Sequence, residues 1–174
     1  MSEKLHFMYA LLARLLKLQN EAMDVISMGK ELVASGVDGL SNGGFWIWDI
    51  KNENQIEFYS PKFRESLGFE NETDFPNLSS SWQNQITNDG LKLAVQNYEK
   101  ALETDTEHPY VQNVVYRTKQ GEHVLIKCSG ILVRIKGNPK FLIGSHQIIA
   151  KDGKPTRKPS RNSRCNFTCG TRLV

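Results

Sequence analysis

Residues 110–149 carry the feature that most constrains the fold, three strand-like segments joined by two short turns. The segments 110–118, 122–135 and 140–149 are rich in β-branched and aromatic side chains, which strands favour. The two connections read Lys-Gln-Gly-Glu and Lys-Gly-Asn-Pro, and short connections that contain glycine are typical of β-hairpins. These residues therefore predict three consecutive antiparallel strands.

The middle segment changes the parity of its apolar residues partway along. They occupy even positions from 124 to 128 and odd positions from 131 to 135. Because side chains alternate between the faces of a strand, this change moves the apolar residues to the other face unless an extra residue is inserted. Ser129 and Gly130 lie at the change. We predict a β-bulge there that keeps one continuous inner face.

A second hairpin is predicted nearer the N-terminus, from strands at 44–50 and 55–59. The first reads Gly-Phe-Trp-Ile-Trp-Asp-Ile, and the turn between them reads Lys-Asn-Glu-Asn. Aromatic and β-branched residues dominate both segments, as in strands. The two hairpin regions together supply five strands.

Helices are predicted between the two hairpin regions. Ser60 is a suitable N-cap for a short helix over 61–67, which begins with proline and is ended by Gly68. A longer helix follows Asn88 or Asp89 as its cap, and its apolar residues keep helical spacing. Strands in hairpins with one inserted block of helices predict an α+β domain. We expect the helices on one face of a five-stranded antiparallel sheet.

Residues 3–34 predict one long amphipathic helix before this domain. Its apolar residues recur at alternating spacings of three and four, which places them on one stripe. The stripe comprises Met8, Leu11, Leu15, Leu18, Ala22, Val25 and Leu32. A stripe of this length suits a short coiled coil and hence a dimer. It equally suits a helix that packs on its own domain, and both interpretations remain open.

Glycines in the run 35–44 separate this helix from the domain. We divide the chain into a helix and linker at 1–40, a domain at 41–150 and a tail at 151–174. The tail carries a charge of +6, which leaves −3 for the rest of the chain. The rest therefore offers no basic surface for nucleic acid. We expect the tail to be disordered because it has few apolar residues.

The three cysteines are too few and too scattered for a disulfide framework. Charged residues interrupt the apolar N-terminal stretch, which also lacks a small-residue cleavage site. The sequence therefore predicts no signal peptide and no membrane span. A reduced, cytoplasmic location is expected.

Six short motifs of the predicted domain resemble those of PAS domains. They lie at 46–50 (Trp-Ile-Trp-Asp-Ile), 59–69 (Tyr-Ser-Pro to Leu-Gly-Phe), 82–89 (Trp, Ile, Asp), 116–121 (Tyr-Arg-Thr-Lys-Gln-Gly), 137–139 (Gly-Asn-Pro) and 144–146 (Gly-Ser-His). The order of the motifs is that of the family. The chain thus resembles a sensory PAS domain, and the resemblance implies the PAS fold.

Two stretches depart from the family pattern. Ile-Ile-Ala at 148–150 stands where the family has Asp-Ile-Thr before an output helix. Residues 87–90 replace His-Pro-Asp-Asp and keep one acid. We therefore expect the signalling surface to lie toward the N-terminal helix.

The resemblance implies a sensory or regulatory module in signal transduction, of the two-component or diguanylate type. Such a module binds a small ligand or a partner and forms a homodimer through the N-terminal helix and the sheet face. Its output would come from an effector protein or a separate domain. The alternative is a structural dimerisation or protein-interaction module without a ligand. A flavin or haem receptor is a third interpretation.

The candidate ligand pocket lies on the segments that surround the cleft between sheet and helices in the resembling family. It comprises Trp46, Trp48, Tyr59, Phe63, Phe69, Trp82, Tyr98 and Cys128. Aromatic walls suit small apolar or planar ligands. Large aromatic residues also fill small cores, and both interpretations remain open.

Candidate cofactor and catalytic residues are few. Flavin-adduct PAS domains place the reactive cysteine in an Asn-Cys-Arg-Phe-Leu-Gln-like run, which Cys128 lacks, so we predict a buried core residue. The long helix has no histidine for haem, and only His108 follows it closely. We find no metal-ligand spacing, nucleophile motif or phosphate-binding loop. We therefore expect neither a metal nor an enzyme, and the sequence requires no cofactor.

Overall fold

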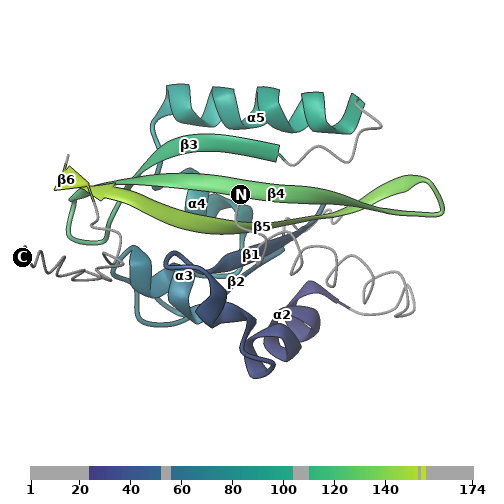
Figure 1. Cartoon of the computed structure of the whole chain (residues 1–174), viewed down its shortest axis with the longest axis horizontal. Helices are drawn as coiled ribbons and strands as arrows, with labels where there is room; N and C mark the ends of the chain where they lie inside the picture. Colours follow the sequence, from purple (N-terminus) through teal and green to yellow (C-terminus); the bar gives the residue numbers. More distant parts are fainter. Residues whose placement is uncertain (1–23, 52–55, 104–109, 153, 156–174) are drawn as a thin grey trace, which may run out of the picture.

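An antiparallel sheet forms the centre of this computed structural model, which describes residues 24–51, 56–103, 110–152 and 154–155 (Figure 1). Its strands are β1 Phe45–Asp49, β2 Glu57–Tyr59, β3 Tyr110–Arg117, β4 His123–Ile135, β5 Asn138–Lys151 and β6 Lys154–Pro155. Neighbouring strands follow the order β2-β1-β5-β4-β3, and β6 pairs with β5. The predicted α+β class and five-stranded antiparallel sheet are confirmed, and β6 is an addition that the sequence did not predict.

The helices lie on both faces of this sheet. They are α2 Val25–Ala34, the 3₁₀ helix η1 Val37–Leu40, α3 Pro61–Ser66, α4 Ser79–Gln83 and α5 Asn88–Glu103. Residues of α3, α4 and α5 pack against the face that carries Trp46, which we call the inner face. Helix α2 packs against the opposite, outer face, which carries Phe45. Two separate apolar cores result, one on each side of β1.

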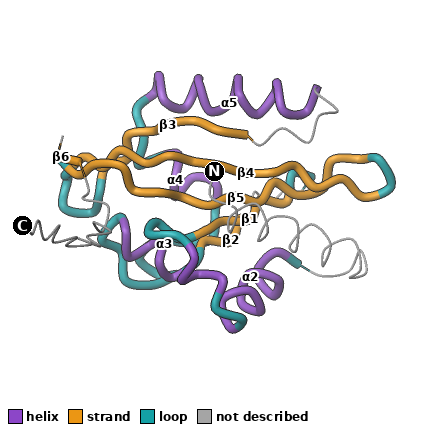
Figure 2. Tube along the Cα trace, viewed as in Figure 1, coloured by secondary structure: helices purple, strands orange, loops and turns teal. Residues whose placement is uncertain are grey.

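The β4–β5 hairpin is the longest in the structure and extends beyond the rest of the sheet (Figure 2). Ile135 pairs with Asn138, so Lys136 and Gly137 form a two-residue turn. Both have positive φ, 50° and 80°. This backbone conformation matches the right-handed twist of the strands, which is why such turns are favoured in hairpins. The predicted hairpin at Lys-Gly-Asn-Pro is confirmed.

The predicted β-bulge in β4 is wrong. Ser129 and Gly130 pair regularly with Ser145 and Gly144 of β5, and the register shifts lie elsewhere, at Leu125/Ile126 and Val133/Arg134. The parity change has another cause, which is that the outer face is also covered. The apolar residues at 124–128 belong to the inner core, whereas those at 131–135 on odd positions pack toward α2. The strand stays continuous and changes the face that it buries.

The single helix predicted over 3–34 is also wrong, because a helix begins at Val25. Asp24 before it has an extended backbone (φ −75°, ψ 156°). Its Oδ1 accepts hydrogen bonds from the amides of Ile26 (3.0 Å) and Ser27 (2.9 Å). Aspartate is a favoured N-cap because its carboxylate satisfies these otherwise unpaired amides. Five residues of the predicted stripe lie outside the described residues, Met8, Leu11, Leu15, Leu18 and Ala22.

The other two stripe residues, Val25 and Leu32, are buried in their own domain. Together with Met28 they join the outer core that contains Phe45 and Phe58. This is the second use that the sequence left open for the helix. A dimer through the N-terminal segment therefore stays a prediction that does not draw on these two side chains.

Gly29 explains how closely α2 approaches the sheet. A Cβ at this position would lie less than 3.0 Å from three atoms of the Phe58 ring. Side chains other than hydrogen cannot occupy that space without moving the helix or the ring. Gly29 interrupts the apolar stripe of the sequence, and in the fold it lies directly against the ring of Phe58 on β2.

The caps of the inner-face helices are partly as predicted. Ser60 caps α3, because its Oγ accepts from the Phe63 amide at 3.3 Å. The cap of α5 is Thr87, whose Oγ1 accepts from the Gly90 amide at 3.1 Å, and not Asn88 or Asp89. Threonine competes well with asparagine and aspartate at this position. No described helix is long and apolar enough to cross a membrane.

The division of the chain at residues 40 and 150 stays a prediction. The tail beyond residue 155 lies outside the described residues. The start of the domain is joined to β5 by Asn42, whose side chain accepts from the Ile148 amide (2.9 Å) and donates to its carbonyl (3.3 Å).

Candidate functional site

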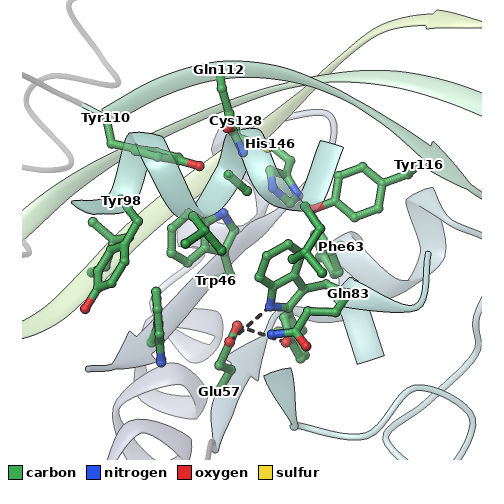
Figure 3. Close-up of a pocket in the computed structure, with 17 residues that line it drawn as sticks. Trp46, Glu57, Phe63, Gln83, Tyr98, Tyr110, Gln112, Tyr116, Cys128 and His146 are labelled. Atoms are coloured by element: carbon green, nitrogen blue, oxygen red, sulfur yellow. Dashed lines mark hydrogen bonds between the residues drawn. The ribbon is translucent and has the colours of Figure 1, made fainter. Parts of the chain in front are cut away.

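An aromatic pocket of about 110 Å³ lies between the inner face of the sheet and helices α4 and α5 (Figure 3). Of the eight predicted pocket residues, seven line it, namely Trp46, Trp48, Tyr59, Phe63, Trp82, Tyr98 and Cys128. The eighth, Phe69, packs instead against the ring of Phe75, with ring centroids 4.8 Å apart. The fold thus brings the predicted aromatic residues together around one cavity. Whether they bind a ligand stays a prediction.

The wall also contains polar residues that were not predicted from the sequence. Among them are Glu57 of β2, Gln112 of β3 and His146 of β5. Each is at least nine-tenths buried. Glu57 has the same parity as Tyr59 on β2, and His146 the same parity as Leu142 on β5. That alternation was the one signal that could have placed them on the inner face.

Trp46 lies flat on the sheet because its neighbour on β5 is a glycine. It pairs with Gly144, where a Cβ would lie less than 3.0 Å from atoms of the indole ring. Only 9% of Trp46 is exposed, and its Nε1 finds no hydrogen-bond partner among the described residues. Buried indole N–H groups usually have an acceptor. The wall of the pocket therefore contains an unused donor.

His146 supplies a second unpaired polar atom. Its ring packs against those of Phe63 (4.6 Å between centroids), Tyr116 (5.5 Å) and Trp46 (6.2 Å). Burial lowers the pKa of His146 to about 3, so the imidazole is neutral at neutral pH. Its Nδ1 is buried and without a partner among the described residues. Two polar atoms on adjacent strands of the wall are thus left unsatisfied.

Glu57 is held in a fixed orientation by three donors. Its Oε1 accepts from Ser79 Oγ (2.5 Å) and Trp82 Nε1 (3.1 Å), and its Oε2 is 2.9 Å from the Tyr59 hydroxyl. Figure 3 marks hydrogen bonds at the Glu57 carboxyl group with dashed lines. Burial raises the pKa of Glu57, and these hydrogen bonds oppose the rise. None of the ion pairs in the described part of the chain involves this carboxyl group.

Arg64 of α3 braces the strand that carries Glu57. Its guanidinium is buried and donates to the carbonyls of Phe75 (3.0 Å) and Tyr59 and to Asn77 Oδ1 (2.6 Å). Asn77 Oδ1 also accepts from the Tyr59 amide at 3.1 Å. These bonds join β2 to the segment that leads into α4. They hold β2 beside the segment that supplies Ser79 and Trp82, two of the donors to Glu57.

Cys128 is a buried residue of β4, as predicted. Burial raises the pKa of its thiol, and a hydrogen bond with Tyr116 opposes the rise. Thiolates are the reactive form of cysteine, so this thiol is unreactive at neutral pH. Among the described residues no group of three or more His, Cys, Asp or Glu could hold a metal ion.

The family model of the PAS fold matches residues 56–146, just over half of the chain. The chain belongs to the PAS family. The match runs from β2, before Glu57, to His146 on β5, so Glu57, Gln112 and His146 all fall inside the PAS region. Strand β1, with Trp46, lies before it.

Solved structures show the same PAS fold at low sequence identity. A sensory box histidine kinase/response regulator from Burkholderia thailandensis is 21% identical, with a TM-score of 0.51 over 69% of this chain and 83% of that chain. The Rhodobacter sphaeroides LOV protein is 16% identical, with a TM-score of 0.54 over 75% and 71% of the two chains. No curated protein matches the chain in sequence.

The pocket does not fit the flavin or haem of light- and gas-sensing PAS domains. Its volume of about 110 Å³ is below the roughly 300–1,000 Å³ of pockets that hold drug-sized ligands, and both cofactors have several fused or linked rings. Cys128 lies on a strand and not on a helix. Helix α5 carries no histidine, and His108 lies outside the described residues.

Proposed function

We propose that this PAS domain is a sensory module that binds a small molecule in its aromatic pocket and transmits occupancy to a partner surface on the sheet. The observation that carries the proposal is the pair of buried, unpaired nitrogen atoms of Trp46 and His146 in the pocket wall. A core built only for packing would fill these positions with apolar side chains. We propose no catalytic role for the pocket.

The energetic cost of the two nitrogen atoms supports a ligand. A buried polar group without a partner costs about 1–3 kcal/mol, and native proteins contain few such groups. A molecule that offers a hydrogen-bonding oxygen to both atoms would recover much of that cost. The alternative occupant is water, since a polar cavity of this size can hold one or more molecules.

Strand β1 links the pocket to the outer face. Trp46 and Trp48 face the pocket side, whereas Phe45 and Ile47 between them pack in the outer core with α2. A ligand that moves the indole rings therefore also changes the packing of α2 on Phe45 and Ile47. It shifts the equilibrium between two arrangements of α2 only by the difference in its affinity for them.

The partner surface that we propose is the outer face of the sheet beyond α2, used in a homodimer together with the N-terminal segment. Val111 and Val115 of β3 point outward and are 47% and 42% exposed. The same residues support the second candidate, an interaction module without a ligand. A cytoplasmic location and an effector protein or separate output segment belong to the same proposal.

Ligand binding is tested by thermal unfolding against a panel of small polar molecules, followed by native mass spectrometry of the purified protein. Trp46→Phe keeps an aromatic side chain but removes the N–H and the five-membered ring, so compounds that bind through the N–H should lose at least about tenfold in affinity, the value of one hydrogen bond of about 1.4 kcal/mol. If no compound raises the unfolding temperature and no small mass accompanies the protein, the ligand-free module is the correct interpretation.

Dimerisation is tested separately with a Val111→Lys, Val115→Lys double variant. Charges on an apolar contact surface oppose association, so the variant should sediment as a monomer if the wild type is a dimer through this face. Lys92→Ala, at an exposed position of α5 on the other side of the sheet, is the control. A wild-type monomer, or an unchanged dimer in the double variant, contradicts the proposed surface.

A further inference from the structure

We propose that the pocket binds a small organic ammonium ion that also carries a hydroxyl group, with the ammonium beside Glu57 and the hydroxyl beside Trp46 and His146. This inference rests on the proposed function, since it names the chemical class of the ligand. It depends on three features of the wall, namely a carboxyl group without a cation, aromatic faces around it, and the two unpaired nitrogen atoms.

Glu57 is the first feature. It is 3% exposed and lines the cavity. A carboxyl group at such a depth is expected to pair with a cation or to stay protonated. The nearest guanidinium, that of Arg64, spends its donors on Phe75, Tyr59 and Asn77 and not on Glu57. A cation for this carboxyl group would therefore have to come from outside the described chain.

Three donors orient this carboxyl group without neutralising it. Tyr59 donates to Glu57 Oε2 (2.9 Å), and Ser79 and Trp82 donate to Oε1. The Leu78 carbonyl oxygen also lies 2.9 Å from the Tyr59 hydroxyl, but it accepts from the Ser81 amide (2.9 Å) and so does not need the Tyr59 proton. An ionised Glu57 therefore has its hydrogen bonds and lacks only a cation.

No other group of the wall carries charge near neutral pH. Burial raises the pKa of the surrounding tyrosines and of Cys128, and lowers that of His146. The tyrosines lie on β2, α5 and β3, and are Tyr59, Tyr98, Tyr110 and Tyr116. The carboxyl group of Glu57 is therefore the one charge that the described wall can develop, and that charge is negative.

Aromatic faces are the second feature. Trp46, Trp48, Trp82 and Tyr98 all line the same cavity, and the rings of Trp48 and Tyr98 have centroids 4.6 Å apart. The negative faces of indole and phenol rings attract cations, most strongly where water is excluded. Quaternary ammonium ions are recognised in this way by cages of aromatic side chains.

The unpaired nitrogen atoms define the other end of the ligand. Trp46 Nε1 is a donor, and the neutral His146 ring can accept or donate at Nδ1. A hydroxyl group can accept from the first and pair with the second. The volume limits the rest, because a cavity of about 150 Å³ holds benzene and this one measures about 110 Å³. A short amino alcohol meets all three conditions.

Binding should depend on the charge of the ligand. An ammonium group gains the attraction of the Glu57 carboxylate and of the ring faces around it. A neutral alcohol of the same shape gains neither.

The test compares two probes of equal size, protonated N,N-dimethylethanolamine and neutral 3-methyl-1-butanol. Titration calorimetry on the full chain at about pH 7 measures affinity. We expect the amine to bind about tenfold more tightly than the alcohol. Glu57→Gln should lower the affinity for the amine to that for the alcohol.

Equal or tighter binding of the alcohol to the wild-type protein overturns the ammonium assignment and leaves the sensory pocket standing. Failure of both probes overturns the assignment too, and it overturns the proposed function only if the wider panel also fails. The amine and the alcohol are compared on the wild-type protein, so the test holds even if Glu57→Gln does not fold.

Discussion

The contact between Gly29 and Phe58 allows a test of whether α2 packs on the sheet. The test is the sign of the change in the free energy of unfolding caused by Gly29→Ala. In Gly29→Ala the new Cβ would lie less than 3.0 Å from three atoms of the Phe58 ring. The ring is 2% exposed and has no space to retreat into. The helix must therefore move away from the sheet.

Two opposing contributions set the size of the effect. Alanine in place of glycine stabilises a helix interior by about 1 kcal/mol, whereas overpacking a core costs about 1–3 kcal/mol. Lifting the helix also exposes part of Val25, Met28 and Leu32, each worth about 1.5–3 kcal/mol when fully buried. We expect a net loss of about 2–4 kcal/mol in the free energy of unfolding.

Urea unfolding followed by circular dichroism measures this loss as a lower midpoint. Lys30→Ala, at an exposed position of the same helix, is the control and should be nearly neutral. In a Phe58→Ala background, which removes the ring, Gly29→Ala should instead be neutral or stabilising by up to about 1 kcal/mol. A stabilised Gly29→Ala in the wild-type background would refute the placement of α2 on the sheet.

Gly144, Arg64 and His146 each allow a prediction. Gly144→Ala should push the Trp46 indole into the cavity and lower the free energy of unfolding by about 1–3 kcal/mol. It should also abolish probe binding measured by calorimetry, and unaltered binding would contradict the close approach of Gly144 to Trp46. Arg64→Met should lower the free energy of unfolding by about 2–4 kcal/mol because several buried acceptors lose their donor. Arg64→Lys should not restore the stability. An Arg64→Met variant as stable as the wild type would contradict the role of the Arg64 hydrogen bonds in holding β2. His146 has a folded-state pKa of about 3 and an unfolded value near 6.5. Between these values the unfolded state binds the extra proton. The free energy of unfolding therefore decreases as the pH is lowered through this window, by up to about 1.4 kcal/mol per pH unit. His146→Gln should flatten the dependence of the urea midpoint between about pH 7 and about pH 5, and equal slopes would contradict a buried neutral imidazole.

The strands were predictable from the sequence because local signals and tertiary structure agree there. Alternating side chains and glycine-containing turns fix β3, β4 and β5 to within a few residues. The long N-terminal helix was mispredicted because the apolar spacing continues through Asp24, whereas the capping bonds of Asp24 to Ile26 and Ser27 start a new helix. Periodicity does not register a local hydrogen bond of this kind.

The candidate site was half predictable. Its aromatic residues are conspicuous in the sequence, and seven of the eight named residues line the cavity. Glu57 and His146 were missed because polar residues in strands are usually exposed. Their burial depends on α4, α5 and the brace of Arg64, which pair residues far apart in the sequence. The bulge predicted at Ser129 failed for a related reason, since nothing local indicates that both faces of β4 are covered.

The three tryptophans of the chain, Trp46, Trp48 and Trp82, all line the same cavity. The intrinsic tryptophan fluorescence of the protein therefore originates at the pocket. Any occupant that contacts an indole face or accepts the Trp46 N–H changes the emission of the whole molecule. The protein thus carries a built-in optical reporter, and an unlabelled sample in a cuvette is enough to screen for its ligand.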